Sequence, residues 1–541
     1  MIGSLGGRRA VALVVAAPAV IAALVYAQTL GHGAVYDDPA ALEMARQPIF
    51  ELLTHRFGLT YLSIRLDQAL CGWMPCYHLT NIVLHAACSA LAGLLALTLT
   101  GRPWVGLLTG ALFAVHPVHV EVVASIENRK DMLAMLFGTT SVLLYRSRAA
   151  WGYAASLVAL LLALSAKDAA AIGIVGLLPL AGMLPWPDEE VPWSERVAMT
   201  VRRLVPLVVV GVLMTVWYGG NLAEKFTPQA VAFTTDRACS TYGEALATSA
   251  AAIPEVARLL VFPMRLSADY PTRPQRGLTT APALTGVAIV LAAVALALWL
   301  APRAPVAAFA VAWVATTYLP LSNVVPLTAY FVAERYLYVP SFGICLLAAL
   351  AIDRLSGRRA VALALAAVVL LAGAIRARVR VRDWRDDVTL WTAALRVFPE
   401  GSARIHSELG RVLAEDGRTE EALPHLEAAL ALEPTRPEAH SHLGFALLKA
   451  GRVSEALPHF RRALELSPEN PLVRHNLAMA LLAAGEREEA IRELGIVASE
   501  EAWRNLPAAV LAAVKRRGMT PEEFRARVRG WLERNEDTPD I

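Results

Sequence analysis

Long runs of apolar residues fill most of positions 1–375 of this 541-residue chain. A helix needs about 20 apolar residues to cross the hydrocarbon core of a bilayer, where its backbone polar groups must all be satisfied internally. The runs therefore predict about eleven membrane-spanning helices, with ten to twelve as the range. They lie at 11–30, 79–99, 104–120, 131–146, 152–166, 169–184, 204–220, 280–300, 305–321, 337–352 and 359–376.

The composition changes abruptly after these runs. Over the whole chain 56% of residues are apolar and 18% are charged, against about 25% charged in soluble domains. The deficit is local, because residues 376–541 are rich in charged and polar side chains. We therefore expect an all-α protein that faces two solvents, a lipid bilayer and water. A net charge of +3 gives no indication of a nucleic-acid partner.

Small residues recur every 34 positions in the polar part, which indicates tetratricopeptide-type helical repeats. We predict a membrane domain at 1–375, an Arg/Trp-rich connecting segment at 376–400, three repeats at 401–502 and capping helices at 503–541. Such an α-solenoid offers a concave surface to an extended peptide or a partner protein. The repeating positions are Gly410, Ala422, Ala429 and Pro434, then Gly444, Ala456, Ala463 and Pro468, then Ala478 and Ala490.

The short loops indicate an orientation. If the N-terminus with Arg8 and Arg9 is cytoplasmic, alternate loops collect arginine, as the positive-inside rule predicts. The arginines that follow the last run, from Arg376 to Arg385, disagree with this scheme. We interpret the first run as an uncleaved anchor, because it is longer than the apolar region of a signal peptide. The protein is then a multi-pass protein of the inner (plasma) membrane.

Ionisable residues collect at the helix ends that this orientation places outside the cytoplasm. Such residues near membrane depth are costly and tend to mark function. Local explanations stay open for several of them: Asp37 or Asp38 as a helix cap before Pro39, His116 as a helix stop, and Lys167 with Asp168 as a paired turn. The set comprises Asp37, Asp38, His116, His119, Glu121, Arg129, Lys130, Lys167, Asp168, Glu334 and Arg335.

Several segments, in this order, resemble the transmembrane and tetratricopeptide-repeat O-mannosyltransferases and their bacterial relatives. That family belongs to the GT-C class of glycosyltransferases, which use polyprenyl-phosphate sugars. The resemblance covers residues 30–500, and HPVHVE with the downstream RKD and AERYLYVPS are its most specific parts. The segments are YDDP (36–39), YHLTNIVLHAACSALAGLL (77–95), HPVHVEVVASIENRKDMLAMLF (116–137), SAKDAAA (165–171), ARLLVFPMRLSADY (257–270), AERYLYVPSFG (333–343) and DWRDDVTLWTAALRVFP (383–399).

The resemblance implies transfer of a hexose, with mannose favoured, from a polyprenyl-phosphate donor to hydroxyl groups of an extracytoplasmic acceptor. Asp37 and Asp38 correspond to the acidic pair of the family, and one of them would act as the catalytic base. The remaining ionisable residues of the set would bind the donor phosphate or sugar, with arginine suited to bidentate phosphate contacts. The repeats would recruit the protein acceptor.

Three other points stay open at the sequence level. A divalent metal is conceivable on His116, His119 and Glu121, but the resemblance implies that no cofactor is required. Cys71 and Cys76 either form a disulfide or stay reduced. The alternative function is a non-enzymatic membrane-anchored repeat scaffold for envelope assembly. A scaffold, however, needs few spans and no cluster of ionisable residues on one side. A transporter is disfavoured because these residues lie at helix ends rather than at mid-membrane.

Overall fold

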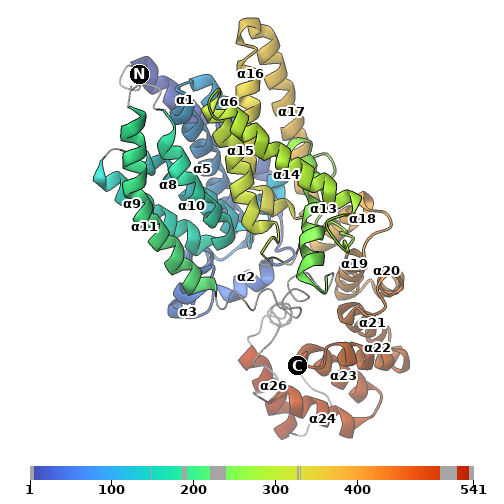
Figure 1. The fold of residues 1–541 in the computed structure, drawn as a ribbon. Helices are drawn as coiled ribbons and strands as arrows, with labels where there is room; N and C mark the ends of the chain where they lie inside the picture. Colours follow the sequence, from blue (N-terminus) through green and yellow to red (C-terminus); the bar gives the residue numbers. More distant parts are fainter. Residues whose placement is uncertain are drawn as a thin grey trace. The chain divides into compact units, whose positions relative to one another are not determined.

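The structure, a computed structural model, describes residues 5–147, 149–185, 192–219, 239–325, 328, 330–499 and 521–534. All regular elements in these residues are helices, which confirms the predicted all-α class (Figure 1). The chain forms two compact units. The membrane unit comprises Met1–His32, Pro48–Leu266 and Thr272–Arg382, and the repeat unit comprises Gly33–Gln47, Ser267–Pro271 and Asp383–Ile541.

Every apolar run predicted from the sequence coincides with a helix of the membrane unit. Short helices and turns connect them, and several of these lie at the candidate site described below. The helices are α1 (Leu5–Tyr26), α3 (Ile49–Thr54), α4 (Gly58–Leu70), α5 (Met74–Thr100), α6 (Pro103–Val115), α7 (Val120–Ala124), α8 (Arg129–Tyr145), α9 (Ala150–Ala166), α10 (Asp168–Met183), α11 (Trp193–Gly219), α13 (Tyr242–Val261), α14 (Ala281–Leu300), α15 (Pro305–Tyr318), α16 (Ser341–Asp353) and α17 (Arg359–Asp383).

Several of these helices have the length and surface of membrane spans. Among the described residues, four are long and apolar enough to cross a bilayer, and a bent pair built from α6 and α7 makes a fifth. Four more helices are apolar but shorter. Large apolar side chains on α14 and α17 face outward, for example Leu298 at 70% and Val368 at 64% exposure. An exposed apolar face of this kind belongs against lipid, so the protein is a membrane protein. The number of crossings stays a prediction.

Glycines allow the first spans to pack closely. Helices α1, α5 and α6 contact one another and lie side by side (Figure 1). A Cβ atom added to Gly106 on α6 would lie 2.9 Å from the carbonyl oxygen of Gly93 on α5. A Cβ atom on Gly93 would in turn lie 3.0 Å from the carbonyl oxygen of Val14 on α1. Small residues at such contacts let helix backbones approach in a bilayer, where association depends on van der Waals packing.

The repeat unit is a row of antiparallel helix hairpins. Glycines spaced by 34 residues end the first helix of each hairpin, with φ of +79° at Gly417, +74° at Gly451 and +81° at Gly485. This left-handed conformation favours glycine. The helices are α2 (Asp38–Met44), α18 (Asp387–Val397), α19 (Ala403–Glu415), α20 (Thr419–Leu432), α21 (Pro437–Lys449), α22 (Val453–Leu466), α23 (Pro471–Ala483), α24 (Arg487–Val497) and α26 (Pro521–Arg534).

In the first two hairpins, a glycine on the first helix faces a large residue on the second. A Cβ atom on Gly444 would lie 3.0 Å from the ring of Phe460, which is fully buried. Each hairpin also carries a polar pair across its two helices. These pairs are His406 with His425 at 3.2 Å, His440 with His459 at 3.1 Å, and Arg474 with Glu493.

The end of the array is described in part. Helix α26 packs on α24, and Phe524 of α26 is buried against the ring of His475. Of the predicted capping segment 503–541, residues 503–520 and 535–541 lie outside the described residues.

Candidate active site

A bend after α6 creates the candidate site. Helix α6 ends at Val115, and Pro117 cannot continue it because proline lacks a backbone N–H. The 3-10 turn η2 (Pro117–His119) and α7 follow at an angle of 50° to α6. Both pack against the 3-10 turn η5 (Glu334–Leu337), which precedes α16. The HPVHVE and AERY segments, more than 200 residues apart in sequence, therefore meet.

Glu121 holds Arg335 through two atoms. One carboxylate oxygen of Glu121 accepts a 2.9 Å hydrogen bond from the backbone N–H of Arg335. The other oxygen pairs with the Arg335 guanidinium. The guanidinium carbon also lies 4.8 Å from the ring centre of Tyr330 and 5.3 Å from that of Tyr336. Cation–π contacts and a carboxylate thus fix this arginine in one place.

Lys167 adds a second cation beside the same tyrosine. Its ammonium nitrogen lies 2.6 Å from Oδ1 of Asp131 and 5.4 Å from the ring centre of Tyr336. Both side chains are almost fully buried, at 7% and 1% exposure. Lys130, next to Asp131 in the chain, pairs with Glu127. Lys167 and Arg335 therefore flank one aromatic ring, and each has its own buried carboxylate.

Of the two histidines of HPVHVE, His119 is fully buried beside these pairs and His116 is partly buried. Nε2 of His119 lies 2.7 Å from the hydroxyl oxygen of Ser341, the first residue of α16. Nε2 of His116 lies 3.1 Å from the carbonyl oxygen of Leu260, and the two imidazole centres are 5.3 Å apart. Nδ1 of neither ring has a hydrogen-bond partner among the described residues. Each histidine thus keeps one ring nitrogen for a further contact.

Three other residues of the predicted set form ion pairs with residues that the sequence analysis did not select. Arg129 is fully buried and lies 2.6 Å from a carboxylate oxygen of Asp67. It also donates to the side chain of Asn81 and to the carbonyl oxygen of Tyr77. This network joins the start of α8 to α4 and α5. Arg129 therefore stabilises the packing of α8 against α4 and α5.

Asp168 and Glu334 also form ion pairs with arginines. Asp168 accepts two hydrogen bonds from the guanidinium of Arg56, at 2.8 and 3.0 Å. Glu334 lies 3.1 Å from the guanidinium of Arg380, and both side chains are fully buried. Arg380 belongs to the arginine-rich stretch that conflicted with the predicted orientation.

Asp37 and Asp38 lie in the repeat unit, at the start of α2. Asp38 is fully buried and accepts a 3.1 Å hydrogen bond from the backbone N–H of Val35, so it stabilises the turn. Asp37 is the N-cap residue of α2 but makes no capping hydrogen bond with its side chain, which is partly exposed. The neighbouring Tyr36 donates its backbone N–H to Asp387 at 2.8 Å, and burial raises the pKa of that aspartate.

One chemical question left by the sequence has a structural answer within the described residues. Cys71, directly after α4, and Cys76, in the first turn of α5, form a disulfide. In the part of the chain that the structure describes, no group of three or more His, Cys, Asp or Glu side chains converges in a way that would hold a metal ion.

Comparisons with known proteins agree with both parts of the fold. Tetratricopeptide-repeat family models match residues 372–437, 407–471 and 447–502, which confirms the repeat prediction and adds α18 to the array. The chain is 28% identical to protein O-mannosyl-transferase Tmtc1 of Drosophila melanogaster, over 77% of this chain and 61% of that protein. It is 27% identical to a protein O-mannosyl-transferase of Caenorhabditis elegans, over 66% of this chain and 51% of that protein.

A third relative is protein O-mannosyl-transferase TMTC3 of Homo sapiens, 26% identical over 72% of this chain and 46% of that protein. The resemblance inferred from the motifs is therefore confirmed. The chain spans about half the length of the curated relatives that it matches.

Proposed function

We propose that this chain is a membrane glycosyltransferase of the GT-C type. It transfers a hexose, with mannose favoured, from a polyprenyl-phosphate donor to hydroxyl groups of an extracytoplasmic protein acceptor. The similarity to proteins named protein O-mannosyl-transferases over two thirds or more of the chain supports the activity. The presence of repeats in the same chain supports a protein acceptor, because such arrays hold extended peptides and raise their local concentration.

The observation that carries the proposal is the pair of anchored cations around Tyr336. Breaking the bond between the sugar and the lipid phosphate places negative charge on the phosphate oxygen. Arg335 and Lys167 are held before any ligand arrives, by Glu121 and Asp131 respectively. Preorganised charges stabilise such developing charge most effectively, because they do not reorient during the reaction. A guanidinium has five N–H donors, so a single carboxylate does not saturate it.

The acceptor hydroxyl needs a base. In the proposed step the acceptor oxygen attacks the anomeric carbon of the sugar. The bond between that carbon and the phosphate oxygen breaks, its electron pair stays on the oxygen, and the lipid phosphate leaves. The hydroxyl proton passes to the carboxylate of Asp37. Asp37 is preferred over Asp38 because Asp38 is buried and bound to the backbone of its own turn.

Nε2 of His116 donates to the carbonyl oxygen of Leu260. Nε2 of His119 donates to the Ser341 hydroxyl, which itself donates to the carbonyl oxygen of Tyr338. His116 and His119 are therefore proposed to accept hydrogen bonds from hydroxyl groups of the donor sugar through Nδ1.

The side of the membrane is also part of the proposal. The Cys71–Cys76 disulfide lies at the N-terminal end of α5, the same end at which Tyr77 and Asn81 receive Arg129. Disulfides persist in oxidising, extracytoplasmic compartments. This supports an active site that faces away from the cytoplasm, in the inner (plasma) membrane.

Purified full-length protein in liposomes, supplied with a labelled polyprenyl-phosphate mannose and a serine- and threonine-containing peptide, tests the proposal. Asp37→Asn is expected to lower turnover about 100-fold or more, the lower range for removal of a general base. Asp416→Asn, an exposed aspartate of the repeat unit, is the matched control. Arg335→Lys keeps the charge but loses bidentate geometry, so it is expected to lower turnover about tenfold.

Each outcome has a distinct meaning. Full activity of Asp37→Asn would refute its role as base but leave the transferase in place. A wild-type protein that releases no label from mannose or other hexose donors would refute the transferase and favour the membrane-anchored scaffold. Activity of Arg335→Lys equal to wild type would remove Arg335 from the phosphate site.

A further inference from the structure

A second basic site lies at the other end of the membrane unit. Helices α6 and α16 pack against each other, and both carry the candidate active site at one end, through His116 and Ser341. At their opposite ends lie Arg102, just before α6, and Arg354, just after α16. Thirteen helical residues separate the two ends of α6, a length of about 20 Å at 1.5 Å per residue.

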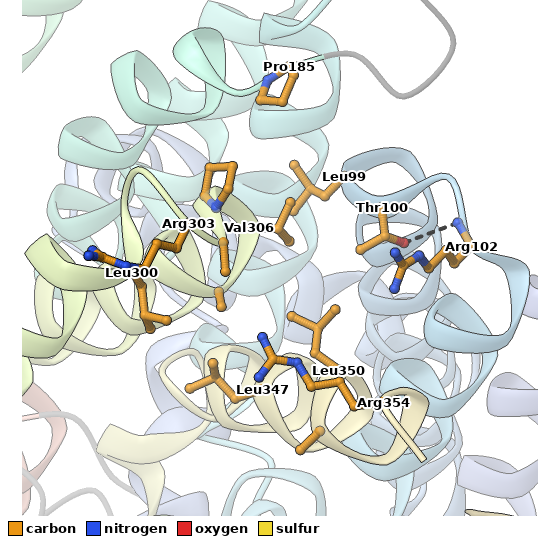
Figure 2. A pocket seen from close by; sticks show the side chains of 14 residues that line it. Leu99, Thr100, Arg102, Pro185, Leu300, Arg303, Val306, Leu347, Leu350 and Arg354 are labelled. Carbon is orange, nitrogen blue, oxygen red and sulfur yellow. Dashed lines mark hydrogen bonds between the residues drawn. The ribbon is translucent and has the colours of Figure 1, made fainter. Parts of the chain in front are cut away.

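The arginines at that end border a cavity of about 730 Å³. Its walls come from the end of α5, the loop between α14 and α15, and the end of α16. Figure 2 shows Arg102, Arg303 and Arg354 around apolar side chains that include Leu99, Val306 and Leu350. None of the described residues that line the cavity is acidic. A cavity with three cationic groups and apolar walls matches a ligand that has an anionic head and hydrocarbon chains.

The three arginines differ in how far they are already neutralised. Arg102 lies 2.7 Å from a carboxylate oxygen of Asp353, so its charge is compensated. Arg303 donates to the carbonyl oxygen of Trp299 and stacks on that indole at 4.9 Å, which leaves its charge uncompensated. Arg354 makes no side-chain hydrogen bond or ion pair with any residue that the structure describes. Two cations are therefore available to an anion.

The surface around the cavity suits the hydrocarbon part of a lipid. Leu298 and Trp299 near the end of α14 are 70% and 56% exposed, and they continue the outward apolar face of that helix. Tryptophan and arginine together are typical of the boundary between acyl chains and headgroups. A headgroup in the cavity would place its chains along α14, within the bilayer.

We propose that this cavity binds the phosphate headgroup of an anionic phospholipid. Arg303 and Arg354 donate to the phosphate oxygens, a contact for which the planar guanidinium is suited. Basic pockets between transmembrane helices bind anionic headgroups in this way. The site lies at the membrane face opposite the candidate active site. It does not depend on the proposed transferase activity.

Full-length protein in neutral detergent, titrated with short-chain phosphatidylglycerol and followed by native mass spectrometry, tests this site. Arg354→Gln is expected to weaken binding about tenfold, which corresponds to about 1.4 kcal/mol and is close to the usual contribution of one hydrogen bond to a charged group. Arg354 has no described partner to lose, so the variant keeps its fold, checked by gel filtration. Arg358→Gln, an exposed arginine near the same end that does not line the cavity, is the matched control.

Short-chain phosphatidylcholine and inorganic phosphate form two further arms. Weak binding of phosphatidylcholine and poor competition by phosphate support a lipid site. Equal losses in Arg354→Gln and Arg358→Gln would overturn the proposal in favour of general surface charge. Equal affinity for both lipids would also overturn it, and full competition by inorganic phosphate at the lipid's concentration would indicate a site for a free anion only.

Discussion

Removing the ammonium of Lys167 is expected to destabilise the membrane unit by about 3–5 kcal/mol, the usual cost of breaking a buried ion pair. The ammonium lies 2.6 Å from Oδ1 of Asp131, and both groups are almost fully buried. At an effective dielectric constant of about 20, two unit charges at that distance attract by roughly 6 kcal/mol, which desolvation partly offsets. Lys167→Met would leave Asp131 as a buried carboxylate without its counterion.

A double-mutant cycle separates this cause from lost packing. Asp131→Asn removes the charge that Lys167→Met leaves behind, so the double variant is expected to regain most of the stability lost in Lys167→Met. The assay is the midpoint of thermal unfolding of purified protein in one detergent, for wild type, both single variants and the double variant. If the double variant were no more stable than Lys167→Met, the unpaired carboxylate would not be the cause. A stable double variant that lacks transfer activity would support a direct role for Lys167 with the donor.

Three further predictions concern other parts of the chain. Burial lowers the pKa of His406 and His425, so the folded repeats bind fewer protons than the unfolded chain. The stability of the repeats is therefore highest above about pH 6.5 and falls as the pH drops below it. When the pH is lowered, amide hydrogen exchange should become faster in α19 and α20 but not in the third hairpin. Equal acceleration in both places would refute this prediction. Phe460→Ala should cost about 3–5 kcal/mol and speed exchange in α21 and α22; unchanged exchange would refute that packing. A membrane-impermeant thiol reagent should label Cys71 and Cys76 on intact cells only after reduction; labelling only in inverted vesicles would reverse the proposed orientation.

The helices were predictable because their causes are local. A bilayer demands long apolar segments, and each apolar run became a helix. The 34-residue spacing likewise predicted the hairpins, because a small residue such as Gly444 is needed wherever a bulky residue such as Phe460 packs against it. These patterns involve neighbours within one or two helices, so the sequence carries them directly.

The partners of the charged residues were not predictable. Asp168 is held by Arg56, 112 residues away, and Glu334 by Arg380. Such pairs depend on how the helices pack, which the spacing within each helix does not encode. The same holds for the segments Gly33–Gln47 and Ser267–Pro271, which belong to the repeat unit although both lie within the predicted membrane domain 1–375. A single sequence could show that the charged residues are polar and close to helix ends. It could not show which element each of them, or each of these two segments, would pack against.

Charge compensation distinguishes the two ends of α6 and α16 and suggests different roles for them. At the candidate active site, Arg335 and Lys167 are buried and each is paired with a carboxylate. Burying either cation without a partner would cost several kcal/mol, so each can be buried only because a carboxylate is paired with it. The resulting charges are fixed in position, which suits stabilisation of a transition state. At the opposite end the arginines are exposed to solvent, so an unpaired guanidinium there carries no burial cost. Arg354 can therefore remain without a counterion until a ligand binds. A fixed cation favours catalysis and an uncompensated one favours binding, because only the second gains a new counterion when the ligand enters.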